Sequence, residues 1–449
     1  MEREDTGDVP LLMDMADDAI EEAREERMSF MEKYITSKMQ PGSVKGSMFT
    51  MTVSIVGAGV LALPYAVNQV GVLLGIGIIL LGAFLAYYSL FLLVVCSDIS
   101  HETSYMHLAN AASGPRLAMF VQGAICMNLL GTSVGFFVAS SELILLVVKP
   151  TQYFGAIEMG SDRDTRNALI GALCLCFVYP LSLFRSLSSL RFSSLFSILC
   201  IVFLTITVVA KYFQFAHLGF APDFWYQCKH LTMFNFKPSR ILTAVPLVVF
   251  AYTCHPNVLP IYLQLKRRSS PRMYKVARRS LGVASLVYLA LSVFAVFTFG
   301  DATRSNFLEN DYHGDAAITA GCIFLGVSIV VTTPLYIHTL RNCINEAIWG
   351  NAGSTVRHVL LTTLLVAIAV TLALLATDIA SVLGILGATT NPIICFVMPA
   401  FYICQLGDAS LICHKYTAVT ICLLLCALSG CSLFQQLHHT PTQSSGFFD

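Results

Sequence analysis

Long stretches of the chain carry no charged residue, and their spacing predicts a bundle of membrane-spanning helices. Residues 46–97 hold no Asp, Glu, Lys or Arg, a run of 52 residues. A helix needs about 20 apolar residues to cross a bilayer, so this run predicts two helices with a turn near 68–71. Nine more uncharged runs follow, at 117–141, 167–184, 192–210, 241–265, 280–300, 316–337, 359–377, 379–407 and 416–437. The pattern predicts an all-α membrane protein with eleven transmembrane helices.

Composition agrees with this pattern and excludes several functions. The chain is 56% hydrophobic and 12% charged, whereas a soluble domain carries about 25% charged residues. Lys plus Arg equals Asp plus Glu, at 27 each, so the net charge gives no sign of a nucleic-acid partner. No Cys/His spacing typical of a metal site occurs, and no metal or cofactor is expected. The bilayer is the expected environment.

Acidic residues crowd at the start of the chain. Residues 1–32 hold twelve of the 27, so we expect residues 1–43 to form an acidic, mostly disordered cytoplasmic tail. Residues 8–12 read Asp-Val-Pro-Leu-Leu, the pattern of an acidic di-leucine sorting signal. A cytoplasmic sorting or signalling partner of this tail is therefore one hypothesis. The membrane is then the plasma membrane, or a lysosome or vacuole if the signal acts.

The positions of Lys and Arg predict the orientation. With the N-terminus in the cytoplasm, the inner loops hold 13 of these residues and the outer segments hold 8. Seven of the 13 lie in residues 266–279, a cluster that also suits contact with anionic lipid. Residues 438–449 are then a short extracellular or lumenal tail.

Two glycines interrupt the first predicted helix near its middle. Gly57 and Gly59 flank Ala58, and glycine costs about 1 kcal/mol in a helix, so local unwinding is favoured. Unwound backbone at that depth is tolerated only where it lines a cavity. The freed N–H groups of Val56 to Gly59 would then hold an anion such as a carboxylate. A close-packing face of small residues is the alternative explanation.

The sixth predicted helix is also interrupted. Pro256 removes a backbone donor there and stands between the polar residues His255 and Asn257. Breaks at matching places in two halves indicate an inverted-repeat transporter, with repeats at about 44–213 and 241–407 and an extra helix at about 416–437, all within a transmembrane domain at 44–437. The carbonyl groups expected to accept from a substrate ammonium group are those of Phe250, Ala251, Tyr252 and Thr253.

Both interrupted segments resemble a known family. Residues 56–66, Val-Gly-Ala-Gly-Val-Leu-Ala-Leu-Pro-Tyr-Ala, resemble the first-helix motif of the amino acid/auxin permease family. Residues 254–262, Cys-His-Pro-Asn-Val-Leu-Pro-Ile-Tyr, resemble the sixth-helix motif of its sodium-coupled neutral amino acid transporter branch. The likeness extends over about 44–435 in helix count and spacing. It implies a LeuT-like fold with a 5+5 inverted repeat, an amino acid substrate, and symport with protons or sodium.

One departure from the family pattern bears on the driving ion. In the sodium-coupled branch, an asparagine four residues before the first glycine helps to hold sodium, and this chain has Val53 there. The matching threonine of the eighth helix is retained as Thr332. Because a hard cation needs several oxygen ligands, the loss of one favours proton coupling or uniport over sodium coupling.

The remaining polar residues of the predicted spans are candidates for ligand or ion contact. Glu142 ends the third helix and is either a proton carrier or substrate ligand, or a residue that snorkels to the interface. His255 either titrates, as histidine does near physiological pH, or ties the broken helix together. Asn128 and Thr389 are candidates to line the cavity. The candidates for ion coupling are thus Glu142, His255 and Thr332.

These features predict a secondary active transporter that moves amino acids by alternating access. A cationic substrate requires an acid in the pocket, whereas a neutral one does not, and the sequence leaves both open. One alternative is an amino acid-sensing receptor on the same fold, and another is a transporter of a related amine such as a polyamine. A membrane-embedded enzyme is not expected, because no paired carboxylates, His-metal cluster or nucleophile with a base occur in the spans.

Overall fold

The computed structural model describes residues 42–148, 162–184, 191–219, 222, 224–312, 314–350 and 354–439. Every regular element within these ranges is a helix. Ten of these helices are long and apolar enough to cross a membrane, and a bent helix pair at the start makes up to eleven. The predicted all-α membrane fold is therefore confirmed, while the two predicted tails lie almost wholly outside the described residues.

The first half of the chain contains five spans, and the first of these is a broken helix. Its pieces are α3 (Val44–Ile55), the 3₁₀ turn η1 (Ala58–Leu61) and α4 (Leu63–Val70). Gly71 follows with φ of 88°, a backbone conformation that favours glycine, and it makes the turn expected near 68–71. The other elements of this half are α5 (Val72–Ser100), the short α6 (Tyr105–Ser113), α7 (Pro115–Val148), α8 (Asp162–Leu173) with η3 (Cys174–Val178) and α9 (Tyr179–Ser182), and α10 (Arg191–Leu218).

The second half follows the short α11 (Phe224–His230) and contains a broken sixth span. Its two pieces are α12 (Pro238–Ala251) and α13 (His255–Gln264). The seventh to ninth spans are α14 (Ser270–Phe299), α15 (Ala316–Trp349) and α16 (Thr355–Leu375), with the short turn η6 (Phe307–Glu309) between the first two. The tenth span comprises α17 (Ile379–Ala388), α18 (Thr390–Pro392), η7 (Ile393–Val397) and α19 (Met398–Leu406), and α20 (Ile412–His439) is the last helix.

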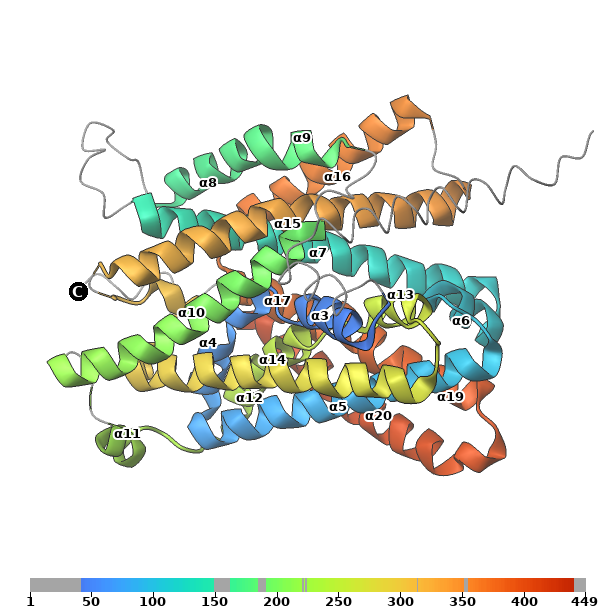
Figure 1. Ribbon diagram of the computed structural model, residues 1–449, viewed down its shortest axis with the longest axis horizontal. Helices are drawn as coiled ribbons and strands as arrows, with labels where there is room; N and C mark the ends of the chain where they lie inside the picture. Colours follow the sequence, from blue (N-terminus) through green and yellow to red (C-terminus); the bar gives the residue numbers. More distant parts are fainter. Residues whose placement is uncertain are drawn as a thin grey trace, which may run out of the picture.

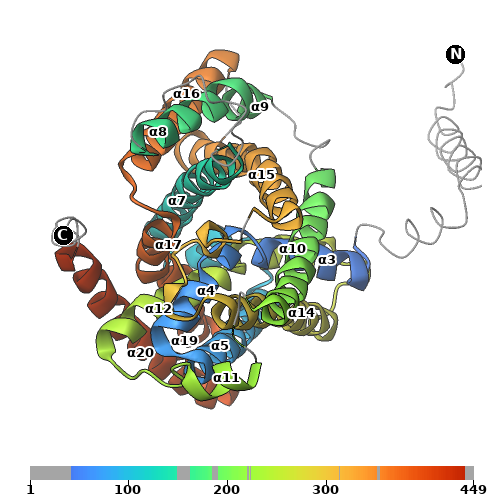
Figure 2. The same ribbon diagram turned by 90° about the vertical axis from the view of Figure 1, so that its left-hand side faces the viewer.

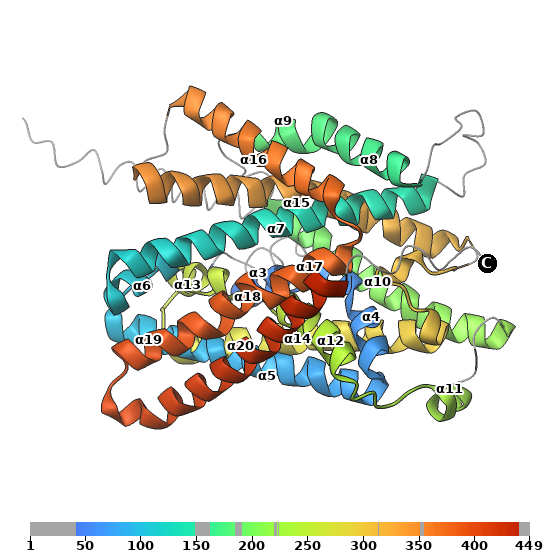
Figure 3. The ribbon, with the colours of Figure 1, turned by 180° about the vertical axis from the view of Figure 1, so that it is seen from behind.

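The broken spans occupy the middle of the bundle. The long helices run along the horizontal direction of Figure 1, and the end-on view in Figure 2 shows α3, α4 and α12 among the other spans. α7 packs along α15, α3 packs on α14, and α12 packs on both α4 and α17. α20 runs along the outside past α12 and α19 (Figure 3).

Exposure of apolar side chains distinguishes the central helices from the peripheral ones. Most of the tenth span and of α7 is buried, whereas only 22% of α20 and of the α8–α9 span is buried. Leu423 and Leu424 on α20, for example, are 65% and 61% exposed. Lipid tails are as apolar as leucine, so this outer surface suits a bilayer. Buried polar side chains such as those of Asn128, Ser328 and Asn391 lie in the interior, on the third, eighth and tenth spans.

Candidate functional site

A cavity of about 250 Å³ lies inside the bundle, where the two broken spans face α7, α10 and α15. The broken spans contribute Val53, Ser54, Ile55, Val56, Gly57, Gly59, Phe250, Ala251, Thr253, Pro256 and Asn257. The other three helices contribute Asn128, Leu129, Thr132, Phe136, Ser197, Ile201, Leu325, Ser328, Ile329, Thr332, Leu335, Tyr336 and Thr339. None of these described lining residues is charged, so the guest meets hydroxyl, amide and backbone groups together with hydrocarbon.

The first span breaks at Val56 and Gly57, and its two pieces differ in direction by 57°. Two of the four N–H groups expected to be free at this break are used within the chain. The N–H group of Val56 donates to the carbonyl of Thr52 at 2.8 Å, and that of Gly57 donates to Ile55 at 3.1 Å. The N–H group of Gly59 donates to no carbonyl of a neighbouring element in the described part of the chain, so it is available to a guest.

The two glycines of this break have different surroundings. A Cβ atom at Gly57 would have no other atom within 4 Å, because this glycine borders the cavity. A Cβ atom at Gly59 would lie 3.2 Å from the Cα of Ala251, so Gly59 packs closely on the end of α12. Open backbone thus occurs at Gly57 and close packing at Gly59; the side chain of Ala58 between them lies outside the described residues.

The sixth span breaks over the three residues between α12 and α13. Pro256 lies in the first turn of α13, and in a continuous helix its ring would clash with the carbonyl of Tyr252 four residues earlier. The end of α12 closes on itself: the N–H group of Thr253 donates to Phe250 at 3.0 Å, and its Oγ1 donates to Val249 at 2.9 Å. The carbonyl groups of Phe250 and Val249 are therefore already hydrogen-bonded at this break.

A buried tyrosine that sequence reasoning missed connects the two breaks. The hydroxyl of Tyr288 on α14 lies 2.8 Å from the carbonyl oxygen of Ile55, at the end of α3, and 2.8 Å from that of Ala251, at the end of α12. A hydroxyl has one proton, so it donates to one carbonyl at a time. The available signal was that Tyr288 is the single tyrosine of the apolar run 280–300.

The structure places only one of the two side chains predicted to line the cavity beside it. Asn128 borders the cavity, and its Nδ2 donates to Thr390 Oγ1 at 3.1 Å and also to Asn391 Oδ1, which ties α7 to the tenth span. Thr389 is not among the lining residues, and its hydroxyl donates to the carbonyl of Ile385 at 2.6 Å within α17.

Hydroxyl groups gather on the cavity wall near α15. Thr332 and Val53 both line the cavity. The hydroxyl of Thr332 donates to the carbonyl of Ser328 at 2.7 Å, and the hydroxyl of Ser328 lies 2.5 Å from that of Ser197 on α10. Val53 adds only hydrocarbon to this wall.

Glu142 lies away from the cavity and is buried among other parts of the chain. It is 7% exposed, and its carboxylate accepts hydrogen bonds from Asn306 Nδ2 at 3.1 Å and from the N–H group of Ile379 at 3.2 Å. Ile379 is the first residue of α17, and the N-terminus of a helix stabilises a negative charge. Glu142 therefore joins α7 to the tenth span and to the segment before α15.

His255 and Tyr252 border a second, smaller cavity of about 100 Å³ between α5, α12 and α20. His255 is fully buried, and neither of its ring nitrogens has a hydrogen-bond partner among the described residues. Tyr252 shares a hydrogen bond of 2.8 Å with the hydroxyl of Ser285. Two of the predicted residues near the sixth-span break thus point away from the main cavity. No cluster of three His, Cys, Asp or Glu residues in the described chain is placed to hold a metal.

Comparisons with known proteins agree on a transport fold. The family described as transmembrane amino acid transporter protein matches residues 40–436. Three solved structures share the fold: MhsT in complex with L-phenylalanine (TM-score 0.54, 13% identity, 87% of this chain and 98% of that one), a manganese transporter of Eremococcus coleocola (0.57, 11%, 93% and 90%), and a Na⁺-coupled sialic acid symporter (0.51, 11%, 92% and 92%). At these identities the likeness shows the fold alone, which is the LeuT fold expected from the sequence.

Proposed function

The chain belongs to the family of transmembrane amino acid transporter proteins, and from this premise we propose that it is a secondary active transporter that moves amino acids by alternating access. The observation that carries this proposal is the cavity bounded by the breaks of the first and sixth spans and lined without charged side chains. The two repeats, at about 44–213 and 241–407, would move against each other around this site.

Backbone groups at the two breaks suit the two charges of an amino acid. The N–H group of Gly59 has no carbonyl partner in the described chain, and in our proposal it donates to the substrate carboxylate beside the open Gly57. Carbonyl groups from Phe250 to Thr253 accept from the substrate ammonium group. A carbonyl has two lone pairs, so those already bonded within the chain retain room for a second donor.

The uncharged lining supports a neutral amino acid as the substrate. A lysine or a polyamine adds a positive charge, and burying a charge without a partner is strongly unfavourable. Glu142 is a buried acid on α7, but it is not among the lining residues, and its carboxylate is hydrogen-bonded to Asn306 and Ile379. A cationic side chain would therefore find no carboxylate among the described lining residues.

We propose proton coupling in preference to sodium coupling. Val53 offers hydrocarbon on the cavity wall, and the hydroxyl of Thr332 already donates to Ser328. A sodium ion needs several oxygen ligands. With Val53 in place of an asparagine, this wall offers one side-chain oxygen fewer. Glu142 is the acid that we assign as the proton carrier, because a buried carboxyl group within a span is costly and typical of proton pathways.

Uptake by purified protein in proteoliposomes tests the proposal. We expect a radiolabelled neutral amino acid to accumulate when an inward proton gradient is imposed, and not when a sodium gradient is imposed alone. Lysine and a polyamine should accumulate at least about tenfold less, in line with the cost of an unpaired charge. Absence of uptake for every amino acid would contradict the transport function, and sodium-driven uptake would contradict the proton assignment.

The variant Glu142→Gln tests the proton carrier separately. The amide keeps the shape of the side chain but cannot release a proton, so exchange of labelled for unlabelled substrate should persist while accumulation driven by pH is lost. Asn306→Ala is the matched control, because it removes a hydrogen-bond partner of Glu142 without removing the carboxyl group. Retained proton-driven accumulation in Glu142→Gln would show that another group carries the proton.

Deletion of residues 1–40 separates the transporter from a receptor on the same fold. The deletion removes the acidic tail and leaves every described cavity residue in place, so uptake should persist. Loss of a cellular amino acid response with uptake intact would favour the sensing role and a signalling partner for the tail. Relocation of the shortened protein from a lysosome or vacuole to the plasma membrane would favour the sorting signal at residues 8–12.

A further inference from the structure

The start of the described chain lies against the loop that joins α13 to α14. The N–H group of Lys266 donates to the carbonyl of Gly42 at 2.8 Å. A Cβ atom at Gly42 would lie 2.2 Å from the carbonyl oxygen of Gln264, so the two backbones are in close contact. Slightly further on, the hydroxyl of Ser280 on α14 donates to the carbonyl of Met48 on α3 at 2.9 Å. The described chain therefore begins at this loop.

The loop is strongly positive. We call residues 266–279, which comprise this loop and the first ten residues of α14, the basic loop, because they hold seven Lys and Arg residues and no Asp or Glu. Four of the seven are exposed and make no hydrogen bond or ion pair with the described part of the chain, namely Arg267, Lys275, Arg278 and Arg279. An unpaired cluster of this kind attracts an acidic partner.

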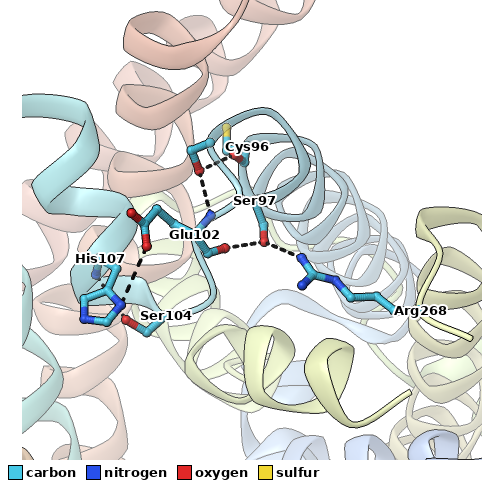
Figure 4. Close-up of polar contacts among 7 residues, drawn as sticks. Cys96, Ser97, Glu102, Ser104, His107 and Arg268 are labelled. Atoms are coloured by element: carbon cyan, nitrogen blue, oxygen red, sulfur yellow. Dashed lines mark hydrogen bonds and ion pairs between the residues drawn. The ribbon is translucent and has the colours of Figure 1, made fainter. Parts of the chain in front are cut away.

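The other basic side chains of this loop have local roles. The guanidinium group of Arg268 lies 4.5 Å from the ring centre of Tyr262 and donates to Ser97 Oγ at 3.4 Å, as Figure 4 shows for the second contact. Arg272 donates to the carbonyl of Lys266 at 2.5 Å. These residues shape the loop and are left unchanged in the tests below.

The acidic groups beside the basic loop are already engaged. Asp98 accepts from the hydroxyl of Tyr262 at 2.7 Å and from the hydroxyl of Ser270. Glu102 Oε2 lies 3.7 Å from His107 Nδ1 (Figure 4). Neither carboxylate pairs with the four exposed basic residues, which leaves their charge uncompensated within the described structure.

We propose that the acidic segment at residues 1–32 of this chain docks on the basic loop. The segment holds twelve acidic residues against three basic ones, so its charge is complementary to that of the loop. The nine residues 33–41 between them span at most about 30 Å when extended, which keeps the segment within reach of the loop. A tethered partner acts at an effective concentration in the millimolar range, so individually weak surface ion pairs suffice.

The docked segment lies next to one piece of each broken span. α3 and α13 both contribute residues to the main cavity, and the basic loop begins where α13 ends. A contact at this place therefore influences the relative positions of α3 and α13. This consequence rests on the proposed transport function, whereas the docking itself does not and is measured without transport.

Zero-length cross-linking of carboxyl to amine groups tests the docking in the full chain, held in nanodiscs of neutral lipid. Carboxyl groups of residues 1–32 should cross-link to Lys266 and Lys275 at least about fivefold more than to Lys237, which lies at the other end of the sixth span. The yield should fall several-fold between 0.05 and 0.5 M salt, because salt at these strengths shortens the Debye length from more than 10 Å to a few Å. Equal yields at Lys237 and at the basic loop would overturn the proposal.

A charge swap distinguishes specific pairing from proximity. Arg278→Glu with Arg279→Glu leaves both target lysines in place and should lower the cross-link yield at least about threefold. Adding Glu21→Lys with Glu22→Lys should restore it. The matched control, Arg278→Gln with Arg279→Gln, should give an intermediate yield. A yield that does not respond to the swap would overturn the proposal even if cross-links form.

A second nanodisc preparation with anionic lipid tests whether lipid headgroups compete with the acidic segment for the basic loop. Cross-links that persist there support docking of the acidic segment in a membrane of that charge. Complete loss of the cross-links there, with retention in neutral lipid, would assign the basic loop to anionic lipid headgroups and overturn the proposal.

Discussion

The breaks in the first and sixth spans occupy corresponding places in the two halves, yet they expose different chemistry. The first break turns the chain by 57°, borders the cavity at Gly57 and leaves the N–H group of Gly59 without a carbonyl partner in the described chain. The sixth break is closed by hydrogen bonds of Thr253, and two neighbouring side chains, Tyr252 and His255, border a different cavity.

The difference follows from how each sequence interrupts its helix. Glycine removes side-chain bulk and leaves its N–H group in place, so an unwound glycine segment offers donors to a guest. Proline removes its own donor and displaces the carbonyl four residues earlier, so a proline break frees backbone acceptors. In the proposed site, the first break supplies donors and the sixth break supplies acceptors, which suits a zwitterion better than either break alone.

The largest expected effect comes from the contact between the two breaks. In Gly59→Val, the Cβ atom would lie 3.2 Å from the Cα of Ala251, and the extra methyl groups would force η1 and α12 apart. Overpacking of this kind costs about 3 kcal/mol or more, so uptake should fall by about 100-fold or more. Initial rates of labelled amino acid uptake, normalised to protein in the membrane, measure the loss.

Gly57→Ala is the matched control for that variant. Its Cβ atom would meet nothing within 4 Å, and the φ of −116° at Gly57 is open to alanine. Uptake should remain within about threefold of the original, with a raised KM because the methyl group takes up cavity space. A comparable loss in both variants would mean that the two glycines act in the same way and that the contrast between them is wrong.

Removal of the hydroxyl group that joins the breaks has the next largest effect. Tyr288→Phe removes the donor shared by the carbonyls of Ile55 and Ala251. The Ile55 carbonyl keeps the N–H group of Gly57, whereas the Ala251 carbonyl loses the hydroxyl. A buried acceptor left without a partner costs about 1–3 kcal/mol, so the maximal uptake rate should fall about tenfold. Tyr252→Phe, which loses only a contact with Ser285, should cost less than about threefold, and equal losses would show that Tyr288 has no special role.

The places of the breaks were predictable because glycine and proline act locally. Gly57 and Gly59 lower helix stability wherever they occur, and Pro256 excludes a helical bond at a fixed distance before it. The number of spans was predictable for a similar reason, because each uncharged run must match the thickness of a bilayer.

The side chains that surround the cavity were less predictable, because their directions depend on packing between helices distant in sequence. Glu142, Thr389 and His255 are polar residues of predicted spans, but the structure places all three outside the main lining. The sequence gives no sign of the role of Tyr288, because the two carbonyl groups near its hydroxyl are 233 and 37 residues away along the chain. No local pattern reports such a contact.

A smaller effect is expected from restoring an oxygen near the first break. Val53 lines the cavity with Thr332 and Ser328, and Val53→Asn adds a carbonyl oxygen to that wall. We expect sodium to stimulate uptake about threefold, because the cation gains one oxygen ligand while the other groups of the wall are not arranged to coordinate it. Val53→Leu, which adds no oxygen, is the control, and sodium stimulation in both variants would show that the cation binds elsewhere.

The smallest effect is expected at the sixth break, from His255→Leu. His255 is fully buried, borders the apolar second cavity, and has no hydrogen-bond partner for its ring among the described residues. Replacement of an unpartnered polar group by an apolar one of similar size is close to neutral, so uptake should stay within about twofold and keep its dependence on pH. If instead His255→Leu inserts normally but loses proton-driven accumulation, His255 at the sixth break carries the proton. The coupling ion would then bind at the sixth break and not at Glu142.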